Sequence, residues 1–268
     1  DHEQFIKDGY VILKNLVPLA TVEAAVRQLE KNEELTEDSG HFISHSNDLI
    51  EACITDSVLD ALQELHGDSH QTSRSRANWG GYPRKYTPDK DDGSDVVDLG
   101  VHIDENYPCI LPDCCSTKVV IALSRVSPRG GAYIYAPGSP LRFLALMIAS
   151  PGIMNEAAGD VAHSGPCMEF LAEPGDVMLA HSHIAHAGSI NVSSPTTRHM
   201  LLLSKGVDER IAPGKKPFAE MSTMEKANSA RYLQNRFGVQ FQTPALEDDD
   251  TLANVLSNGF TPAGGIKA

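Results

Sequence analysis

The chain has no long apolar run, since none of its hydrophobic stretches approaches the roughly 20 residues that a membrane-spanning helix requires. Its first residues, Asp1-His2-Glu3-Gln4, lack the basic-then-apolar pattern of a secretion signal. The five cysteines are an odd number without C-x-x-C spacing, which argues against a zinc ribbon and against a disulfide framework. We therefore expect a soluble cytoplasmic protein with reduced thiols.

Positive charge is also scarce. Lys and Arg total 22 against 36 for Asp and Glu, which gives a formal net charge of −14. Such an acidic surface repels phosphate backbones and anionic lipid head groups, so nucleic acid and membranes are excluded as partners. A small molecule is the partner that we expect, and an anionic one could still bind in a local basic pocket. Nothing in the sequence indicates an oligomeric state.

The order of apolar patterns predicts one domain, because no internal repeat and no low-complexity linker interrupts the chain. The expected parts are an N-terminal strand and helices (1–69), a β core (70–206) with an insert (141–165), and a helical tail (207–268). Short β-rich runs separated by Gly and Pro are typical of a sandwich or barrel. The core strands are expected at 96–103, 118–123, 132–136, 177–179 and 200–203. Outside the core, helices are expected at 3–8, 18–32, 48–66 and 221–237, with a strand at 10–13.

Candidate metal ligands occur in two places. His102 and Asp104 lie two positions apart where the expected strand 96–103 ends, so that in continued strand geometry the imidazole and the carboxylate point to the same face. A second cluster, with His181, His183 and His186, follows the apolar segment 177–179. Two histidines and one carboxylate leave the opposite face of a metal open, as ferrous oxygenases need for a co-substrate and O2. The spacing does not decide which histidine of the second cluster is the ligand.

Arg198 begins the apolar strand that follows these histidines. An arginine at the start of a buried strand needs an anion, and its planar guanidinium binds a carboxylate through two parallel hydrogen bonds. The distal carboxylate of 2-oxoglutarate would meet this need. A structural ion pair is the alternative, and we favour 2-oxoglutarate because an unpaired buried charge is costly.

Several short segments occur in a fixed order along the chain. They are Phe5–Pro18, His102-x-Asp104, Ile121–Leu123, Pro128–Gly131, Pro137–Ser139, Gly175–Val177, His186–Gly188, Asn191 and Arg198. This order resembles the phytanoyl-CoA dioxygenase (PhyH-like) group of Fe(II)/2-oxoglutarate-dependent oxygenases, and the match covers most of residues 3–206. The resemblance implies a mainly β fold with flanking helices around a double-stranded β-helix (jelly-roll, cupin-like) core.

The resemblance also implies roles for individual residues. It points to His186, with His102 and Asp104, as the Fe(II) ligands, with 2-oxoglutarate and O2 as co-substrates and ascorbate as a supporting reductant. The group's usual polar residue two positions after the distal ligand is Gly188 here, so Ser189 becomes the candidate hydroxyl for 2-oxoglutarate. Lys85 is the candidate for its ketoacid end.

Retention of Asp104 further indicates the type of reaction. Related halogenases replace this carboxylate with Gly or Ala, so we expect oxidation of a C–H bond, above all hydroxylation, with release of succinate and CO2. The hydroxylase would act on a small-molecule metabolite that the sequence does not identify.

Other residues receive weaker assignments. Asn106, Tyr107 and Trp79 are candidate substrate contacts, although Trp79 has the pattern of a core residue. His181 and His183 are expected to flank the pocket or to orient ligands rather than bind metal. Two other functions remain open. One is a cupin-like iron dioxygenase that does not use 2-oxoglutarate, and the other is a catalytically silent jelly-roll protein that binds a ligand.

Overall fold

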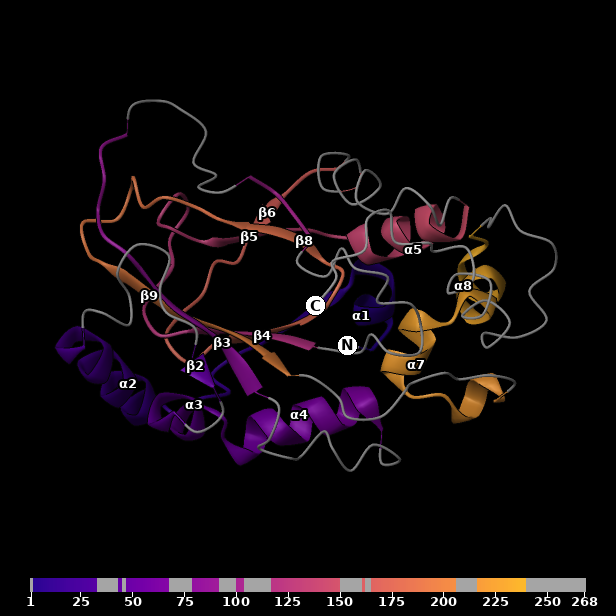
Figure 1. The fold of residues 1–268 in the computed structure, drawn as a ribbon, viewed down its shortest axis with the longest axis horizontal. Helices are drawn as coiled ribbons and strands as arrows, with labels where there is room; N and C mark the ends of the chain where they lie inside the picture. The colour runs from indigo at the N-terminus through magenta and orange to yellow at the C-terminus, as the bar shows by residue number, and fades with distance from the viewer. Residues whose placement is uncertain are drawn as a thin grey trace, which may run out of the picture.

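The computed structural model describes most of the β core and the helices around it. The described residues are 2–32, 43–44, 47–67, 79–91, 100–103, 117–149, 161, 165–205 and 216–239. Figure 1 shows two facing layers of strands, with helices below the larger layer and at one end. No helix among these residues is long and apolar enough to cross a membrane.

The larger sheet has six antiparallel strands in the order β1-β7-β4-β9-β3-β2. Its strands are β1 (Tyr10–Leu13), β2 (Ile43–Ser44), β3 (Trp79–Tyr86), β4 (Thr117–Ala122), β7 (Val177–His181) and β9 (Arg198–Lys205). β4 and β7 are buried along their whole length because both faces of the sheet are covered. Each accordingly contains a continuous apolar run, 119–122 in β4 and 177–180 in β7, rather than an alternating pattern.

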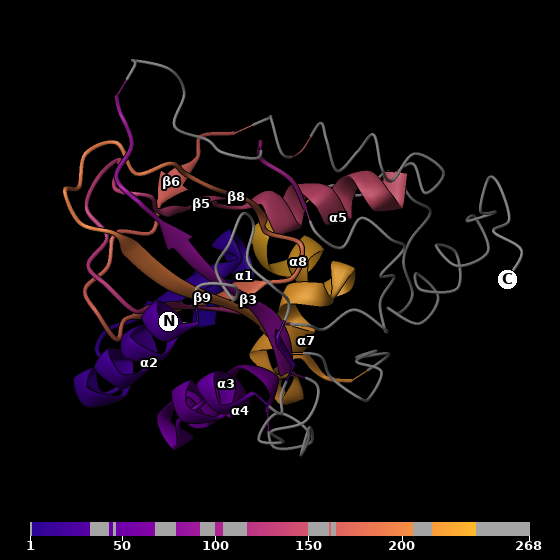
Figure 2. The same cartoon turned by 60° about the vertical axis from the view of Figure 1, so that its left-hand side comes forward.

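The smaller sheet faces the larger one. It has three antiparallel strands in the order β6-β5-β8, namely β5 (Tyr133–Ala136), β6 (Met168–Glu169) and β8 (Ala185–Gly188). The apolar residues between the sheets form a cluster that we call the inner core, which includes Tyr10, Val120, Met178, Met200 and Tyr135. Figure 2 shows β5 and β8 on one side of this space and β3 and β9 on the other.

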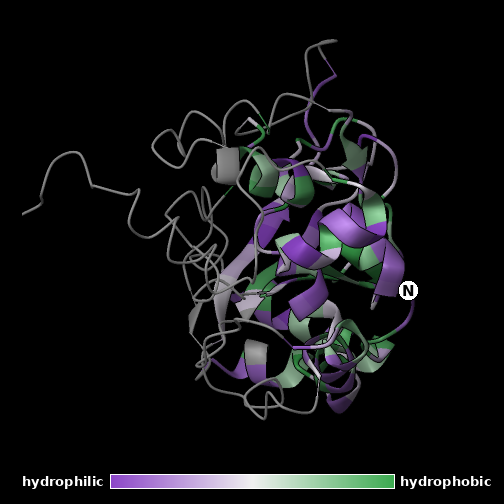
Figure 3. Ribbon diagram, turned by 90° about the vertical axis from the view of Figure 1, so that its right-hand side faces the viewer, coloured by the Kyte–Doolittle hydropathy of each residue, from purple (hydrophilic) through white to green (hydrophobic). Residues whose placement is uncertain are grey.

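Helices cover the other face of the larger sheet and one end of the molecule. They are α1 (His2–Asp8), α2 (Leu19–Lys31), α3 (Asp48–Cys53), α4 (Asp56–His66), α5 (Ser139–Ala149), α7 (Thr223–Asn228) and α8 (Ala230–Phe237), with a short 3-10 turn, η4 (Phe218–Glu220). Helices of this kind bury one stripe and expose the other, and in Figure 3 several of them carry both green and purple residues. A second apolar cluster, which we call the helix-side core, includes Val119, Val177 and Leu201 from the sheet and Leu29 and Leu62 from the helices.

Two of the expected helices are interrupted. The helix expected at 48–66 divides into α3 and α4, because the Thr55 side chain accepts a hydrogen bond from the backbone N–H of Val58 and begins a new helix. The helix expected at 221–237 divides in the same way at Ser229, which accepts from the N–H of Tyr232. Threonine and serine side chains favour the first position of a helix. The spacing of apolar residues runs on across Thr55 and Ser229, so it does not reveal that one helix ends there and another begins.

Candidate functional site

The site is built on a pairing between two histidines far apart in the sequence. His102 and His186 form an isolated antiparallel bridge. Their backbones exchange both hydrogen bonds, His102 N–H to His186 O at 2.9 Å and His186 N–H to His102 O at 2.8 Å. Directly paired residues point to the same face of a sheet, and the two ring centroids lie 4.7 Å apart. The structure therefore brings these two predicted ligands together.

Both imidazoles are held in the same tautomer. Nδ1 of His102 lies 3.0 Å from the carbonyl oxygen of Gly100, and Nδ1 of His186 lies 3.0 Å from the carbonyl oxygen of Ile184. A carbonyl can only accept a hydrogen bond, so Nδ1 carries the proton in each ring and Nε2 carries the lone pair. Metal-binding histidines are usually oriented in this way. The pair is thus suited to bind a metal ion through Nε2.

Neighbouring side chains fix the position of His186. Tyr133 on β5 stacks against its ring, with centroids 5.1 Å apart and planes 23° apart. The buried hydroxyl of Ser139, at the start of α5, accepts the backbone N–H of Ala185 at 2.8 Å and holds the beginning of β8. The His186 side chain therefore projects from a rigid strand into the inner core.

Arg198 lies on the opposite sheet and faces the same interior. It begins β9, pairs with Tyr86 across the β3–β9 register, and is only 2% exposed. Its guanidinium carbon lies 4.0 Å from the centre of the Tyr86 ring. Stacking on an aromatic ring fixes the plane in which the N–H groups of a guanidinium lie.

Two glycines bring the sheets together at this point. A Cβ at Gly131, where φ is +78°, would lie 3.2 Å from Nε of Arg198 and 3.2 Å from Cβ of Tyr86. A Cβ at Gly188 would overlap the hydroxyl oxygen of Tyr86. Tyr86 therefore reaches from β3 across the interior to β8, two residues beyond His186. These close approaches link the histidine pair to the arginine.

Lys85 is not brought to this site, although it precedes Tyr86. Its register partner is His199, and successive residues of a strand point to opposite faces. Lys85 therefore projects from the face on which Leu201 packs into the helix-side core, away from Arg198. The placement does not support Lys85 as a ligand of 2-oxoglutarate. Trp79 is likewise buried in the helix-side core rather than exposed to the interior between the sheets.

Ser189 follows Gly188 and is fully buried. Its backbone N–H donates to the carbonyl oxygen of Ala132, and strand alternation sends its side chain to the face opposite that of Gly188. Its hydroxyl has no hydrogen-bond partner among the described residues. Its role as a 2-oxoglutarate contact stays a prediction.

Three of the predicted site residues, Asp104, Asn106 and Tyr107, lie outside the described residues. Their predicted roles therefore stay predictions. Within the part of the chain that the structure describes, no group of three or more His, Cys, Asp or Glu side chains is arranged to hold a metal ion. The histidine pair is the described portion of the predicted ligand set.

His181 and His183 occupy a different environment from His186. Nδ1 of His181 accepts the backbone N–H of His183 at 3.1 Å, so Nε2 carries the proton and donates to Oδ1 of Asn228, also at 3.1 Å. Burial, together with the nearby charges of His181 and Lys118, holds the pKa of His183 well below 6.5. The His181 ring ties the end of β7 to α7, and the His183 ring packs edge-on against Phe143 of α5, with centroids 5.0 Å apart.

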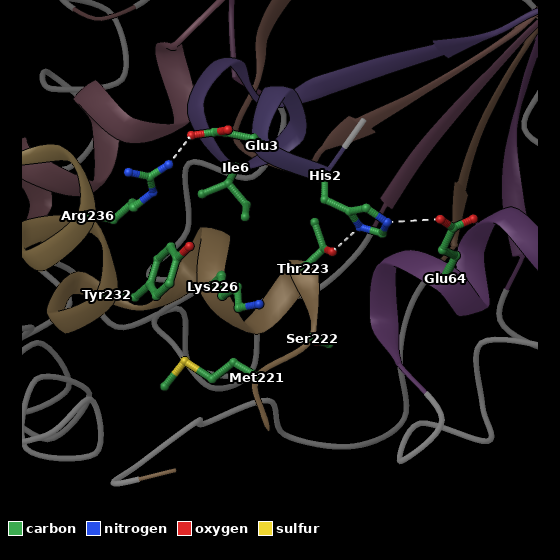
Figure 4. A pocket seen from close by; sticks show the side chains of 10 residues that line it. All are labelled: His2, Glu3, Ile6, Glu64, Met221, Ser222, Thr223, Lys226, Tyr232 and Arg236. Atoms are coloured by element: carbon green, nitrogen blue, oxygen red, sulfur yellow. Dashed lines mark hydrogen bonds and ion pairs between the residues drawn. The ribbon is translucent and has the colours of Figure 1, made fainter. Parts of the chain in front are cut away.

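A cavity of about 500 Å³ lies elsewhere, between α1, α4, α7 and α8. None of the predicted site residues lines it. Figure 4 shows two pairs among the side chains that line it, His2 with Glu64 at 2.9 Å and Arg236 with Glu3 at 2.7 Å. These pairs join α1 to α4 and α8, and each partner is more than half exposed to solvent. The cavity is therefore a solvated junction between helices and is separate from the histidine pair.

Tyr86 is a site residue that the sequence analysis did not identify. Tyrosine is common in strands, and only the β3–β9 register shows that this one faces Arg198. The presence of Gly188 at a position where the resemblance leads one to expect a polar side chain was the one signal in the sequence. From the sequence it indicated Ser189, whereas the structure places the Tyr86 hydroxyl in that space.

Comparison with known proteins establishes the fold. No family model and no curated protein matches the sequence, so the resemblance to the phytanoyl-CoA dioxygenase group stays a prediction. Solved structures do match. The non-heme monooxygenase ThoJ, in a nickel complex, is 18% identical, with 77% of each chain covered and a TM-score of 0.51. AviO1 from Streptomyces viridochromogenes Tue57 is 13% identical, with 78% of this chain and 94% of that chain covered and a TM-score of 0.52.

A third structural neighbour is the epimerase SnoN in complex with Fe3+, alpha ketoglutarate and nogalamycin RO. It is 13% identical, with 76% of this chain and 82% of that chain covered and a TM-score of 0.50. At such low identity the likeness concerns the fold alone. Together with the two facing antiparallel sheets, it confirms the predicted class, a mainly β jelly-roll core with flanking helices.

Proposed function

We propose that this protein is an Fe(II)- and 2-oxoglutarate-dependent oxygenase that oxidises a C–H bond of a small-molecule metabolite. The observation that carries the proposal is the facing arrangement of the His102–His186 pair and the buried Arg198 inside one jelly roll. The structural neighbours support the general class, since ThoJ is a non-heme monooxygenase and SnoN was crystallised with Fe3+ and alpha ketoglutarate. The substrate and the reaction type belong to the proposal alone.

The described residues fit the proposed metal. Two imidazoles with protonated Nδ1 and a lone pair on Nε2 form a ligand pair for ferrous iron, and the sequence supplies Asp104 as the carboxylate. Bound iron would supply the O2 activation that couples decarboxylation of 2-oxoglutarate, to succinate and CO2, to oxidation of the substrate. Tyr133, stacked on His186, restricts the rotation of that ligand.

Arg198 fits the distal carboxylate of 2-oxoglutarate. Its burial keeps water away from the guanidinium, which strengthens a charge-assisted hydrogen bond in this interior. Stacking on Tyr86 fixes the plane of the guanidinium and so fixes the direction in which it can bind a carboxylate. In the proposed reaction Arg198 orients the co-substrate and takes no part in proton transfer.

The test is a two-stage measurement on purified protein. Anaerobic addition of Fe(II) and 2-oxoglutarate should produce a weak visible charge-transfer band. Succinate release should then follow on admission of O2, with ascorbate present and a panel of metabolites as substrates. Arg198→Gln should abolish both signals at ordinary 2-oxoglutarate concentrations, whereas Lys85→Gln, on the neighbouring strand but the opposite face, should keep them.

The two alternative functions give different results in the same test. A cupin-like dioxygenase without 2-oxoglutarate would bind Fe(II) but show no charge-transfer band and no effect of Arg198→Gln on activity. A silent ligand-binding protein would release no succinate with any substrate. Either result with well-folded protein would reject the proposal.

A further inference from the structure

The Tyr86 side chain occupies the space that a side chain at position 188 of β8 would fill if the residue there were not glycine. Gly188 pairs with Tyr133 and projects to the same face of β8 as His186. A Cβ built at 188 would overlap the Tyr86 hydroxyl and lie 3.3 Å from Cζ of that ring. The Tyr86 hydroxyl thus stands where the first atom of any side chain at 188 would be, although it comes from the opposite sheet.

The same tyrosine also orients Arg198. The β3–β9 register places the two residues directly opposite each other, and the guanidinium carbon lies 4.0 Å from the centre of the ring. Asn191 adds a backbone constraint, since its side-chain amide donates to the carbonyl oxygen of Tyr86 at 3.4 Å and to that of Thr196 at 2.9 Å. The Tyr86 hydroxyl and the Arg198 guanidinium are therefore held side by side, and both are hydrogen-bond donors.

We propose that Tyr86 donates a hydrogen bond from its hydroxyl to the distal carboxylate of 2-oxoglutarate, in place of the hydroxyl side chain that Gly188 cannot provide. This inference rests on the proposed function. A carboxylate offers about four lone-pair positions, and a guanidinium in a bidentate arrangement uses two of them. A phenol beside the guanidinium supplies a further donor without adding charge.

Ser189 is the competing source of a hydroxyl. It lies next to Gly188 in the sequence, but strand alternation directs it to the face of β8 opposite that of His186. Tyr86, from the larger sheet, approaches the face of β8 on which His186 lies. Ser189→Ala is therefore a matched control that removes one nearby hydroxyl. Tyr86→Phe removes the other and keeps the ring that stacks on Arg198.

The test compares two ketoacids that chelate a metal in the same way. 2-Oxoglutarate has a distal carboxylate and 2-oxovalerate has a methyl group in its place. Binding of each to the Fe(II)-loaded protein is titrated without O2, using the charge-transfer band, so that the readout does not depend on turnover. Tyr86→Phe should weaken 2-oxoglutarate binding about tenfold, as expected for loss of one hydrogen bond to a charged group. Its affinity for 2-oxovalerate should stay within about twofold of wild type.

Each outcome separates the hypotheses. Ser189→Ala with unchanged affinity for both ketoacids, together with the selective loss in Tyr86→Phe, would support the inference. Equal weakening of both ketoacids by Tyr86→Phe would assign Tyr86 a packing role and overturn it, as would wild-type affinity for 2-oxoglutarate. A wild-type protein that bound neither ketoacid would reject the proposed function, and this inference with it.

Discussion

His181 ends β7 in the larger sheet and His186 lies in β8 of the smaller sheet, five positions later in the chain, yet their rings are held in opposite ways. His181 accepts a backbone N–H at Nδ1 and donates from Nε2 to Asn228, so both ring nitrogens bind other parts of the protein. His186 donates from Nδ1 to the carbonyl oxygen of Ile184, so its Nε2 carries the lone pair. The comparison teaches that the tautomer set by neighbouring backbone atoms, rather than residue type, separates a structural histidine from a candidate ligand.

The largest effect should come from removing the candidate ligand. His186→Ala should weaken Fe(II) binding at least about 100-fold, because loss of a direct ligand exceeds the 10–100-fold effect typical of outer-shell partners. Anaerobic Fe(II) titration measures the affinity, and circular dichroism checks the fold. Unchanged Fe(II) affinity in a folded variant would contradict the assignment of His186 as a metal ligand.

A large effect on stability is expected directly before β7. Asp176 is buried and accepts hydrogen bonds from Nζ of Lys14 at 2.8 Å and from the backbone N–H groups of Asn15 and Glu173, each at 2.9 Å. Asp176→Asn should lower the free energy of unfolding by about 3 kcal/mol at pH 7, as measured by urea denaturation. Fe(II) affinity should not change, since Asp176 joins the start of β7 to the segment after β1 and is not a candidate ligand.

The effect of Asp176→Asn should depend on pH. Burial alone would raise the pKa of Asp176, but the bonds from Lys14, Asn15 and Glu173 more than offset it, so the pKa lies below 3.8. A carboxylate with a lowered pKa stabilises the fold above its unfolded value and loses that contribution as pH falls through its folded value. The difference between wild type and variant should therefore shrink below about pH 4, the range set by that unfolded pKa. A constant difference down to pH 2 would contradict this account.

His181→Ala should produce the opposite result to His186→Ala. Loss of the bonds to Asn228 and to the His183 backbone should reduce stability by about 2 kcal/mol, seen as a lower urea midpoint with an unchanged slope. Fe(II) affinity should stay within about twofold of wild type. A loss of Fe(II) binding as severe as in His186→Ala would show that the structural assignment of His181 is wrong.

The smallest effect concerns the protonation of His183. Its pKa lies well below 6.5, first because of burial and then because of His181 and Lys118, so the folded protein keeps it neutral. The unfolded chain binds a proton below pH 6.5, so stability present above that pH is lost on acidification, by about 1 kcal/mol between pH 6.5 and 5.5. His183→Gln should show a correspondingly shallower fall in the free energy of unfolding over that range. Equal slopes for the two proteins would indicate that His183 is protonated in the folded state.

Local pattern was sufficient to predict most helices and the strands β1, β4, β5, β7 and β9, whereas β3 and β8, which carry Tyr86 and His186, were not among the expected strands. The strand expected at 10–13 is β1, and the helices expected at 3–8 and 18–32 are α1 and α2 within one residue at each end. Prediction failed where one side chain interrupts the backbone, as at Thr55 and Ser229, because an apolar period does not register a capping hydrogen bond. The jelly-roll class followed from the motif order, and the sheet topology and structural neighbours confirm it.

The sequence by itself determined which chemical groups are available, namely the histidines, the arginine and the order in which they occur. Only the tertiary structure decided which of them meet. Lys85 and Tyr86 are adjacent in the chain, but the β3–β9 register sends Tyr86 to Arg198 and Lys85 to the helix side. A shift of one residue in register would exchange the two faces, and register depends on the whole strand pair rather than on either residue. The contact between Gly188 and the Tyr86 hydroxyl joins two sheets. For the same reason, no local sequence pattern predicts it.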